Sequence, residues 1–240
     1  MRCIAHIVNL IVNEGLKEHN DSIARIRGAV KYVRQSPSRL QKFKECVKIE
    51  KIQSKSLLCL DVNTRWNFTY LMLDATQKFE RAFERFDEMD LYFKSELVLG
   101  DVLPNNDDWK NVRRLVLFLE IFYKLTLKVS GSLYVIANRF FEKLCDIYYL
   151  LRYWQLSGDD LLGSLAKKMH EKYDKYWGSL EKMNMLLYVA IVLDSQNKLE
   201  FVNYYFNRMY ASEEVEVMTK KVKEAVVELF NYYRIKLQPS

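Results

Sequence analysis

Glycine and proline are scarce in this sequence, with seven and three residues among 240. A β-sandwich or barrel needs a turn about every eight to twelve residues, and such turns draw on these residue types. Their scarcity argues against an all-β fold and favours helices. Half of the residues are apolar and 14% are aromatic, which is far too many for a disordered chain.

Long apolar runs and paired cysteines are also missing. The longest unbroken apolar run, Met185–Leu193, has nine residues, whereas a membrane-spanning helix needs about 20. The N-terminus shows no small-residue cleavage site of a secretory signal. The four cysteines are scattered without a CxxC pair, as in proteins whose thiols stay reduced in the cytosol or nucleus. We therefore expect an intracellular protein without membrane contact.

Hydrophobic spacing predicts helices along most of the chain, and we expect a mainly α, multi-helix domain. Gly15 is expected to end the first helix and Ser36-Pro37 the second, and Asp107 or Asp108 is expected to cap a later one. At most one or two short strands are expected, the best candidate being 57–62. The other predicted elements are a helix over 68–89, a loop over 98–106, and helices near 133–154, 160–177, 181–193, 198–210 and 213–236.

The net charge of +6 is unevenly distributed along the chain. Between Arg25 and Lys55 there are ten basic and two acidic residues, whereas Glu80 to Asp108 holds nine acidic and three basic residues. This asymmetry predicts a region that faces a polyanion, set apart from an acidic region.

The basic residues also follow helical spacing in two successive predicted helices, with Arg27, Lys31 and Arg34 in one and Lys44, Lys48 and Lys51 in the next. Two helices that each present three cations suit a phosphate backbone. The alternative is an ordinary solvated helix face.

The segment Thr64-Arg65-Trp66-Asn67 places a cation beside a large flat aromatic ring. Arg65 and Trp66 together suit a nucleic acid, because the ring can stack on a base while the guanidinium neutralises a phosphate. The alternative is that Trp66 is a core residue.

Candidate metal and catalytic groups are few. Cys3 and His6 have the spacing of half a zinc site, but no second Cys/His pair completes it, and two buried packing residues are the alternative. Asp61 and Asp194 each follow an apolar run, where either a metal site or a helix cap or surface turn is expected. Phosphate-binding loops and nucleophile elbows are missing from the sequence. We expect no metal, no cofactor and no small-molecule substrate.

Several segments together resemble plant members of the hAT transposase superfamily, the Ac-like and sleeper-type proteins. The matching stretches are Arg2-Cys3-Ile4-Ala5-His6-Ile7-Val8-Asn9-Leu10, Leu60-Asp61-Val62-Asn63-Thr64-Arg65-Trp66-Asn67, Thr69-Tyr70-Leu71-Met72-Leu73, Lys172-Tyr173-Asp174-Lys175-Tyr176-Trp177 and Ala190-Ile191-Val192-Leu193-Asp194.

The resemblance implies an RNase H-like core interrupted by a helical insertion, with three acidic residues that hold two divalent metal ions for DNA cleavage. It implies a single hAT-like region over 1–240, with a core-adjoining segment at 1–66 and the helical insertion at 67–240. By resemblance the chain begins after the second acid, ends before the third, and lacks the zinc finger. Arg65 and Trp66 match the family's Arg-Trp pair, in which the tryptophan stacks on an exposed base.

Three departures from the family pattern suggest relaxed constraint on transposition: Phe68 in place of Ser, Tyr134-Val135-Ile136 in place of Tyr-Pro-Thr, and Ser195-Gln196-Asn197 in place of Pro-Arg-Tyr.

These observations predict a nuclear, DNA-associated fragment of a transposase-derived protein without catalytic activity of its own. Weak, sequence-tolerant contact is expected through Lys31, Arg34, Lys44, Lys48 and Lys51, with Arg65 and Trp66 favouring unpaired DNA. Any homo-oligomer is expected to form through regions outside this chain. One alternative is a helical module whose basic face binds an acidic partner protein. The third class considered is a metal-dependent nuclease that uses Asp61, Asp194 and His6.

Overall fold

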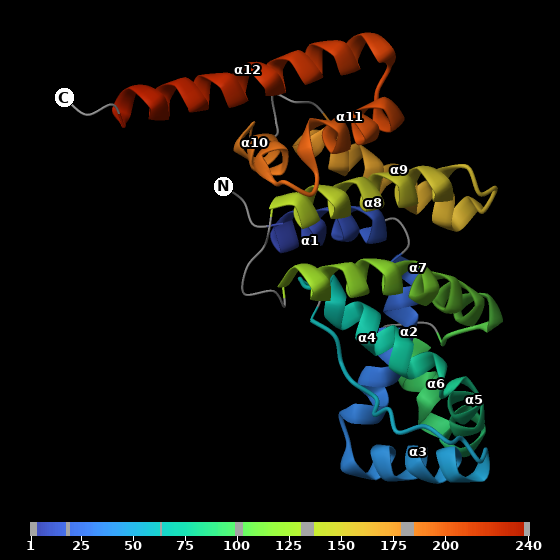
Figure 1. The fold of residues 1–240 in the computed structure, drawn as a ribbon. Coiled ribbons are helices and arrows are strands. Elements are labelled where there is room, and N and C mark those ends of the chain that lie inside the picture. Colours follow the sequence, from blue (N-terminus) through green and yellow to red (C-terminus); the bar gives the residue numbers. More distant parts are fainter. Residues whose placement is uncertain are drawn as a thin grey trace. The chain divides into compact units, whose positions relative to one another are not determined.

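The computed structural model describes residues 4–17, 20–62, 64–98, 103–130, 137–178 and 185–237, and within these ranges it holds twelve helices and no strand (Figure 1). The mainly α prediction is therefore confirmed. The helices are α1 (Ile4–Leu16), α2 (Asn20–Arg34), α3 (Pro37–Ile49), α4 (Trp66–Gln77), α5 (Glu80–Met89), α6 (Leu91–Val98), α7 (Asn106–Ser130), α8 (Ala137–Gln155), α9 (Asp160–Trp177), α10 (Met185–Leu193), α11 (Lys198–Met209) and α12 (Ser212–Lys236). None of the described helices is long and apolar enough to cross a membrane.

The chain divides into two compact units. Unit 1 comprises Met1–Leu127 and Trp154–Met169, and unit 2 comprises Lys128–Tyr153 and His170–Ser240. The predicted boundary between 66 and 67 falls in the first turn of α4, inside unit 1, so it does not separate these two units.

The strand predicted at 57–62 is not formed. Residues 52–61 have no regular secondary structure, and an isolated bridge between Val62 and Arg65 follows them. A sheet needs a neighbouring strand to accept and donate backbone hydrogen bonds, and none lies beside this segment among the described residues. Instead, the guanidinium of Arg34 donates to the carbonyl of Leu58. We call residues 52–61 the extended segment.

The single helix predicted over 68–89 is two helices. The Thr76 hydroxyl donates to the Met72 carbonyl at 2.6 Å, a bond within the helix that tends to bend it. The chain then turns at Lys78 and Phe79. This turn brings Phe79 and Phe83 against Phe43 of α3, with ring centroids 6.1 and 4.6 Å from it. Tertiary packing of these rings therefore outweighs the continuous helical pattern.

Gly15 does not end the first helix, because it lies inside α1. A Cβ atom built on Gly15 would lie 2.6 Å from Cγ of Met169, a residue of α9 in the same unit. Close packing favours glycine there, since a side chain at this position would force Met169 to shift.

Unit 2 has a core rich in aromatic rings. Phe141 of α8 lies against Tyr188 of α10 and Phe206 of α11, with centroids 5.4 and 6.3 Å away. The hydroxyl of Tyr173 donates to the Leu144 carbonyl at 3.2 Å, which satisfies one buried polar group. Burial holds the pKa of the Cys145 thiol far above its ordinary value.

Helix α6 was not predicted. Its first turn is capped by Asp90, whose carboxylate accepts a hydrogen bond from the Tyr92 amide at 3.1 Å. An aspartate before an apolar stretch is an N-cap signal, and it was available in the sequence.

Candidate nucleic-acid interface

Helices α2 and α3 form the framework of the predicted interface. Between them Ser36 caps α3 by accepting a hydrogen bond from the Arg39 amide at 3.5 Å, and Pro37 occupies the first helical position. Proline fits there because that position needs no amide donor. The two helices are in contact. The five cations predicted to bind DNA from these helices, here called the basic set, are Lys31, Arg34, Lys44, Lys48 and Lys51, and all are exposed.

Four other cations of the segment between Arg25 and Lys55 are neutralised within unit 1. Each is held by an acid distant in sequence: Arg25 by Asp108 at 2.8 Å, Arg27 by Asp61 at 2.7 Å, Arg39 by Glu96 at 2.6 Å and Lys42 by Asp90 at 3.5 Å. Three of these four acids belong to the acidic segment 80–108. The prediction that the basic and acidic segments are set apart is therefore wrong, since folding pairs a large part of one with the other.

Of the ten cations between Arg25 and Lys55, this pairing leaves the basic set and Lys55. Within the described part of the chain, the five members of the basic set make no ion pair. Arg34 is engaged by a neutral group, the carbonyl of Leu58, and no carboxylate pairs with it among the described residues. An exposed cation without a carboxylate beside it is available to a phosphate at low desolvation cost.

Lys51 lies beyond the end of α3 in the left-handed region, with φ of 51°. The Lys51 amide donates a hydrogen bond to the Lys48 carbonyl at 3.1 Å. The Ile52 amide donates a hydrogen bond to the Val47 carbonyl, also at 3.1 Å. These two bonds form the Schellman motif, whose left-handed position is usually glycine. The lysine stripe predicted along α3 is therefore regular only to Lys48.

Trp66 is the first residue of α4 and is 1% exposed. In this structure it is a core residue of unit 1, and its ring is not accessible to a base. The stacking predicted for Trp66 is therefore incompatible with this conformation. The neighbouring Arg65 is exposed, and its amide donates to the Val62 carbonyl at 2.8 Å. The apolar period of α4, in which Thr69, Tyr70 and Leu73 are also buried, supports the core interpretation.

Asp108 of α7, which the sequence suggested as a helix cap, is instead a buried centre of hydrogen bonds. It accepts from Ser22 at 2.7 Å, twice from Arg25 at 2.8 Å, and from the Asn105 amide at 2.9 Å. Asn105 in turn accepts from the Asp107 and Asp108 amides, so Asn105 is the helix cap and Asp108 the third residue of a capping box. Burial opposes ionisation, yet these donors prevail and lower the pKa of Asp108.

The candidate metal and catalytic residues either make hydrogen bonds within the fold or are not grouped with other possible metal ligands. Asp61 accepts two hydrogen bonds from Arg27, at 2.9 and 2.7 Å, and one from Thr69 at 2.9 Å, so it anchors the end of the extended segment. Asp194 accepts from the Gln196 amide at 2.9 Å in a turn, as the surface-turn alternative predicts. His6 is exposed on α1, and Cys3 lies outside the described residues. In the described ranges no three His, Cys, Asp or Glu residues are grouped to hold a metal ion.

Two family models match the chain. Residues 1–118 match the ZBED1 RNase-like helical domain, and residues 138–233 match the hAT-like transposase, RNase-H fold. Similar curated proteins include the zinc finger BED domain-containing protein RICESLEEPER 2 of Oryza sativa subsp. japonica, 32% identical over 97% of this chain and 31% of its own length. The putative AC transposase of Zea mays is 28% identical over 97% of this chain and 28% of its own length.

The chain spans about a third of the length of the curated relatives it matches, with 31% of RICESLEEPER 2 and 33% of RICESLEEPER 4 covered. No solved structure matches the chain.

Proposed function

Because this chain belongs to the hAT-type transposase family, we propose that it is a DNA-associated, nuclear part of a transposase-derived protein. Unit 1 contacts the DNA backbone through the basic set, and the chain has no cleavage activity of its own. The observation that supports this proposal is the uneven neutralisation of α2 and α3. Acids from the same unit neutralise four cations of this region, whereas the basic set stays exposed and without a carboxylate.

The chemistry of the basic set favours phosphate contact over base recognition. Four of its five members are lysines, which present a compact charge on a flexible stem and lack the planar fork that reads a guanine edge. Binding through such groups releases counterions and is nearly independent of sequence. We therefore expect weak binding that falls steeply with salt.

The proposal that the chain does not cleave DNA rests on the state of its carboxylates. The Asp61 side chain is 2% exposed, and the Arg27 guanidinium already neutralises it. A divalent metal would have to displace that guanidinium before Asp61 could bind it. Plasmid relaxation with Mg²⁺ or Mn²⁺ tests this point. Cleavage that disappears in Asp61→Ala or Asp194→Ala would contradict it.

The DNA contact is tested by fluorescence anisotropy on a labelled duplex across a salt series. The Lys44→Gln/Lys48→Gln variant removes two exposed charges of α3. It should reduce the slope of log K against log salt by about two, since each phosphate contact contributes about 0.9. The matched control is Lys124→Gln, an exposed lysine of α7 in unit 1 that pairs with Glu120 at 2.6 Å. Its slope should equal that of the unchanged chain.

An equal slope in all three proteins would contradict phosphate contact by α3. Binding to an acidic protein, lost in the α3 variant while DNA binding is unaffected, would favour the interaction-module alternative. Nuclear localisation is tested separately by imaging the tagged chain, and exclusion from the nucleus would contradict that part of the proposal.

A further inference from the structure

The extended segment lies on unit 1 as a single strand without a partner strand among the described residues. It makes no turn or bend between Ile52 and Asp61, and Figure 1 shows it running from the end of α3 to the start of α4. From Ile52 to Leu58 the even-numbered side chains are partly or fully covered, whereas the odd-numbered ones are exposed. This period of two is the pattern of a β-strand that packs one face and exposes the other.

The main chain along one side of this strand is unpaired. In a strand, the amide and carbonyl of one residue point to one edge and those of the next residue to the opposite edge. The Leu58 carbonyl accepts a hydrogen bond from Arg34, so the main-chain groups of Gln53, Lys55 and Leu57 lie on the other edge. These three residues make no hydrogen bond within the described part of the chain. We call this side the open edge, and an edge of this kind is a template for pairing with another strand.

The charges beside the open edge are of one sign. Lys51 and Lys55 are exposed and make no ion pair with other described residues. The acids near the two ends of the segment are already neutralised, because Glu50 and Asp61 each pair with an arginine, at 3.0 and 2.7 Å. The first half of the open edge is therefore positively charged and attracts carboxylates.

The second half of the segment is apolar and exposed. The Leu57 side chain is 78% exposed and the Leu60 side chain is 45% exposed. A strand that covers both halves therefore needs apolar side chains beside Leu57 and Leu60 and acidic side chains beside Lys51 and Lys55.

Lys55 disfavours pairing of the open edge with a second copy of itself. A lysine in the middle of an exposed strand opposes association between like edges. An antiparallel pair of two open edges centred on Lys55 would place the two ammonium groups opposite each other. The occupant that the edge favours is therefore a different, acidic segment.

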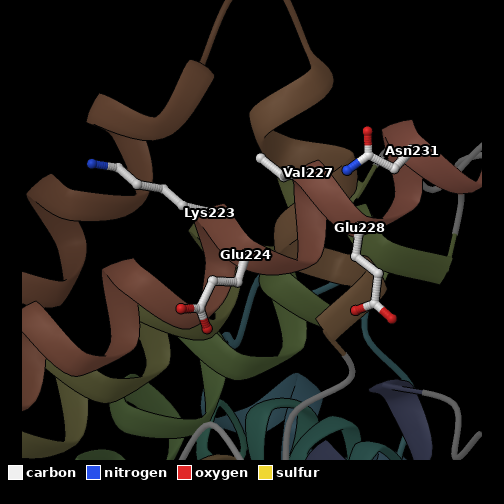
Figure 2. A pocket seen from close by; sticks show the side chains of 5 residues that line it. All are labelled: Lys223, Glu224, Val227, Glu228 and Asn231. Carbon is white, nitrogen blue, oxygen red and sulfur yellow. The ribbon is translucent and has the colours of Figure 1, made fainter. Parts of the chain in front are cut away.

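The hollow beside α12 has no comparable selectivity. Its lining residues, Lys223, Glu224, Val227, Glu228 and Asn231, all come from one helix, and their charges are of both signs (Figure 2). The open edge, in contrast, combines one sign of charge with a fixed row of main-chain donors and acceptors.

We propose that the open edge binds an extended segment of a partner protein, which adds to it as an antiparallel β-strand with apolar side chains followed by acidic ones. Main-chain hydrogen bonds to Gln53, Lys55 and Leu57 hold the added strand. The antiparallel direction is the more stable one per residue. It also sets the order of side chains, because the added strand begins beside Leu60 and ends beside Lys51.

The main-chain contact is tested by fluorescence anisotropy of the full chain with a labelled eight-residue peptide, in which threonine alternates with two valines and then with two glutamates. Methylation of every second amide nitrogen removes the donors from one edge of the peptide and leaves its charge unchanged. One of the two alternate sets should lower the affinity by about tenfold or more, and the other should leave it within about twofold, since only one edge of the added strand faces the protein. Equal effects of the two sets would overturn the proposal, as would failure of the unmethylated peptide to bind at millimolar concentration.

The charge preference is tested with Lys55→Glu. This variant should bind the acidic peptide several-fold more weakly and should bind a peptide with lysines in place of the two glutamates more tightly. Lys110→Glu is the matched control, since Lys110 is an exposed lysine of α7 in unit 1, and it should leave both affinities unchanged. Circular dichroism of both variants establishes that helix content is retained. Equal effects of the two variants would overturn the proposal.

The outcome is separable from that of the DNA proposal, because Lys55 is not a member of the basic set. The same two variants are titrated with duplex and single-stranded oligonucleotides. If Lys55→Glu weakens binding of an oligonucleotide but does not change binding of the acidic peptide, the open edge faces nucleic acid and the proposal is overturned.

Discussion

The two units hold their helices together in different ways. In unit 1, ion pairs join residues far apart in sequence, from Arg25–Asp108 to Arg114–Asp159. In unit 2, ion pairs such as Lys143–Asp146, three residues apart, are local. Long-range contacts there come from aromatic rings, such as Phe141 against Tyr188 and Phe206, and from hydrogen bonds such as Tyr173 to Leu144. Ion pairs respond to pH and salt, whereas apolar burial does not do so directly. Unit 1 should therefore be the unit whose stability depends on solution conditions.

Removal of a buried ring should be costly in both units and should not distinguish them. Trp66→Ala in unit 1 and Phe141→Ala in unit 2, each 1% exposed, should lower the free energy of unfolding by about 3–5 kcal/mol through the cavity that each leaves. Urea titrations at two salt concentrations measure this, and the loss should not change with salt.

Trp66→Ala also decides the role of that ring. Because Trp66 is a core residue, the variant should lose affinity for paired and unpaired DNA alike. An unchanged melting temperature together with a selective loss on unpaired DNA would contradict this and restore the stacking interpretation.

Removal of a buried charge should distinguish the units. Asp108→Asn should cost unit 1 about 3 kcal/mol, because it leaves Arg25 without its charged partner. Asp146→Asn in unit 2 is the control and should cost less than about 1 kcal/mol, since that carboxylate is 45% exposed.

The same variant tests the pH dependence. The folded pKa values of Asp108 and Asp159 are lowered, so their contribution is fully present above the unfolded value of about 4 and is lost as pH falls through the folded values. Acid titration should therefore destabilise unit 1 first, and Asp108→Asn should make its stability less dependent on pH. If unit 2 unfolds at a higher pH than unit 1 as the solution is acidified, the proposed difference in stability between the two units is wrong.

The smallest effect is expected at Lys51. Lys51→Gly should raise the stability of unit 1 by about 0.5–1 kcal/mol, because glycine adopts the positive φ without strain. It should reduce the salt slope of DNA binding by at most about one. Thermal unfolding and anisotropy on the same variant separate the structural role of Lys51 from its charge.

Most of the helices could be predicted from the sequence, because apolar spacing is a local property. The helix predicted at 160–177 is Asp160–Trp177 and the one at 213–236 is Ser212–Lys236. Local pattern was insufficient where packing intervened, as at the turn near Phe79 and at Gly15. The segment 57–62 has strand-like composition, but a strand also requires a partner that the sequence does not reveal.

The candidate site was predictable only in part, and the reason is electrostatic. The sequence by itself determined the number of cations on α2 and α3 and their helical spacing. Only the tertiary structure decided which of them keep an unpaired charge, because Asp90, Glu96 and Asp108 come from elements 48 to 83 residues away from their partners. Ion pairs form between groups that are close in space, and spacing along the chain does not predict which groups these are. The burial of Trp66 could not be predicted for the same reason, since helices distant in sequence can cover a ring.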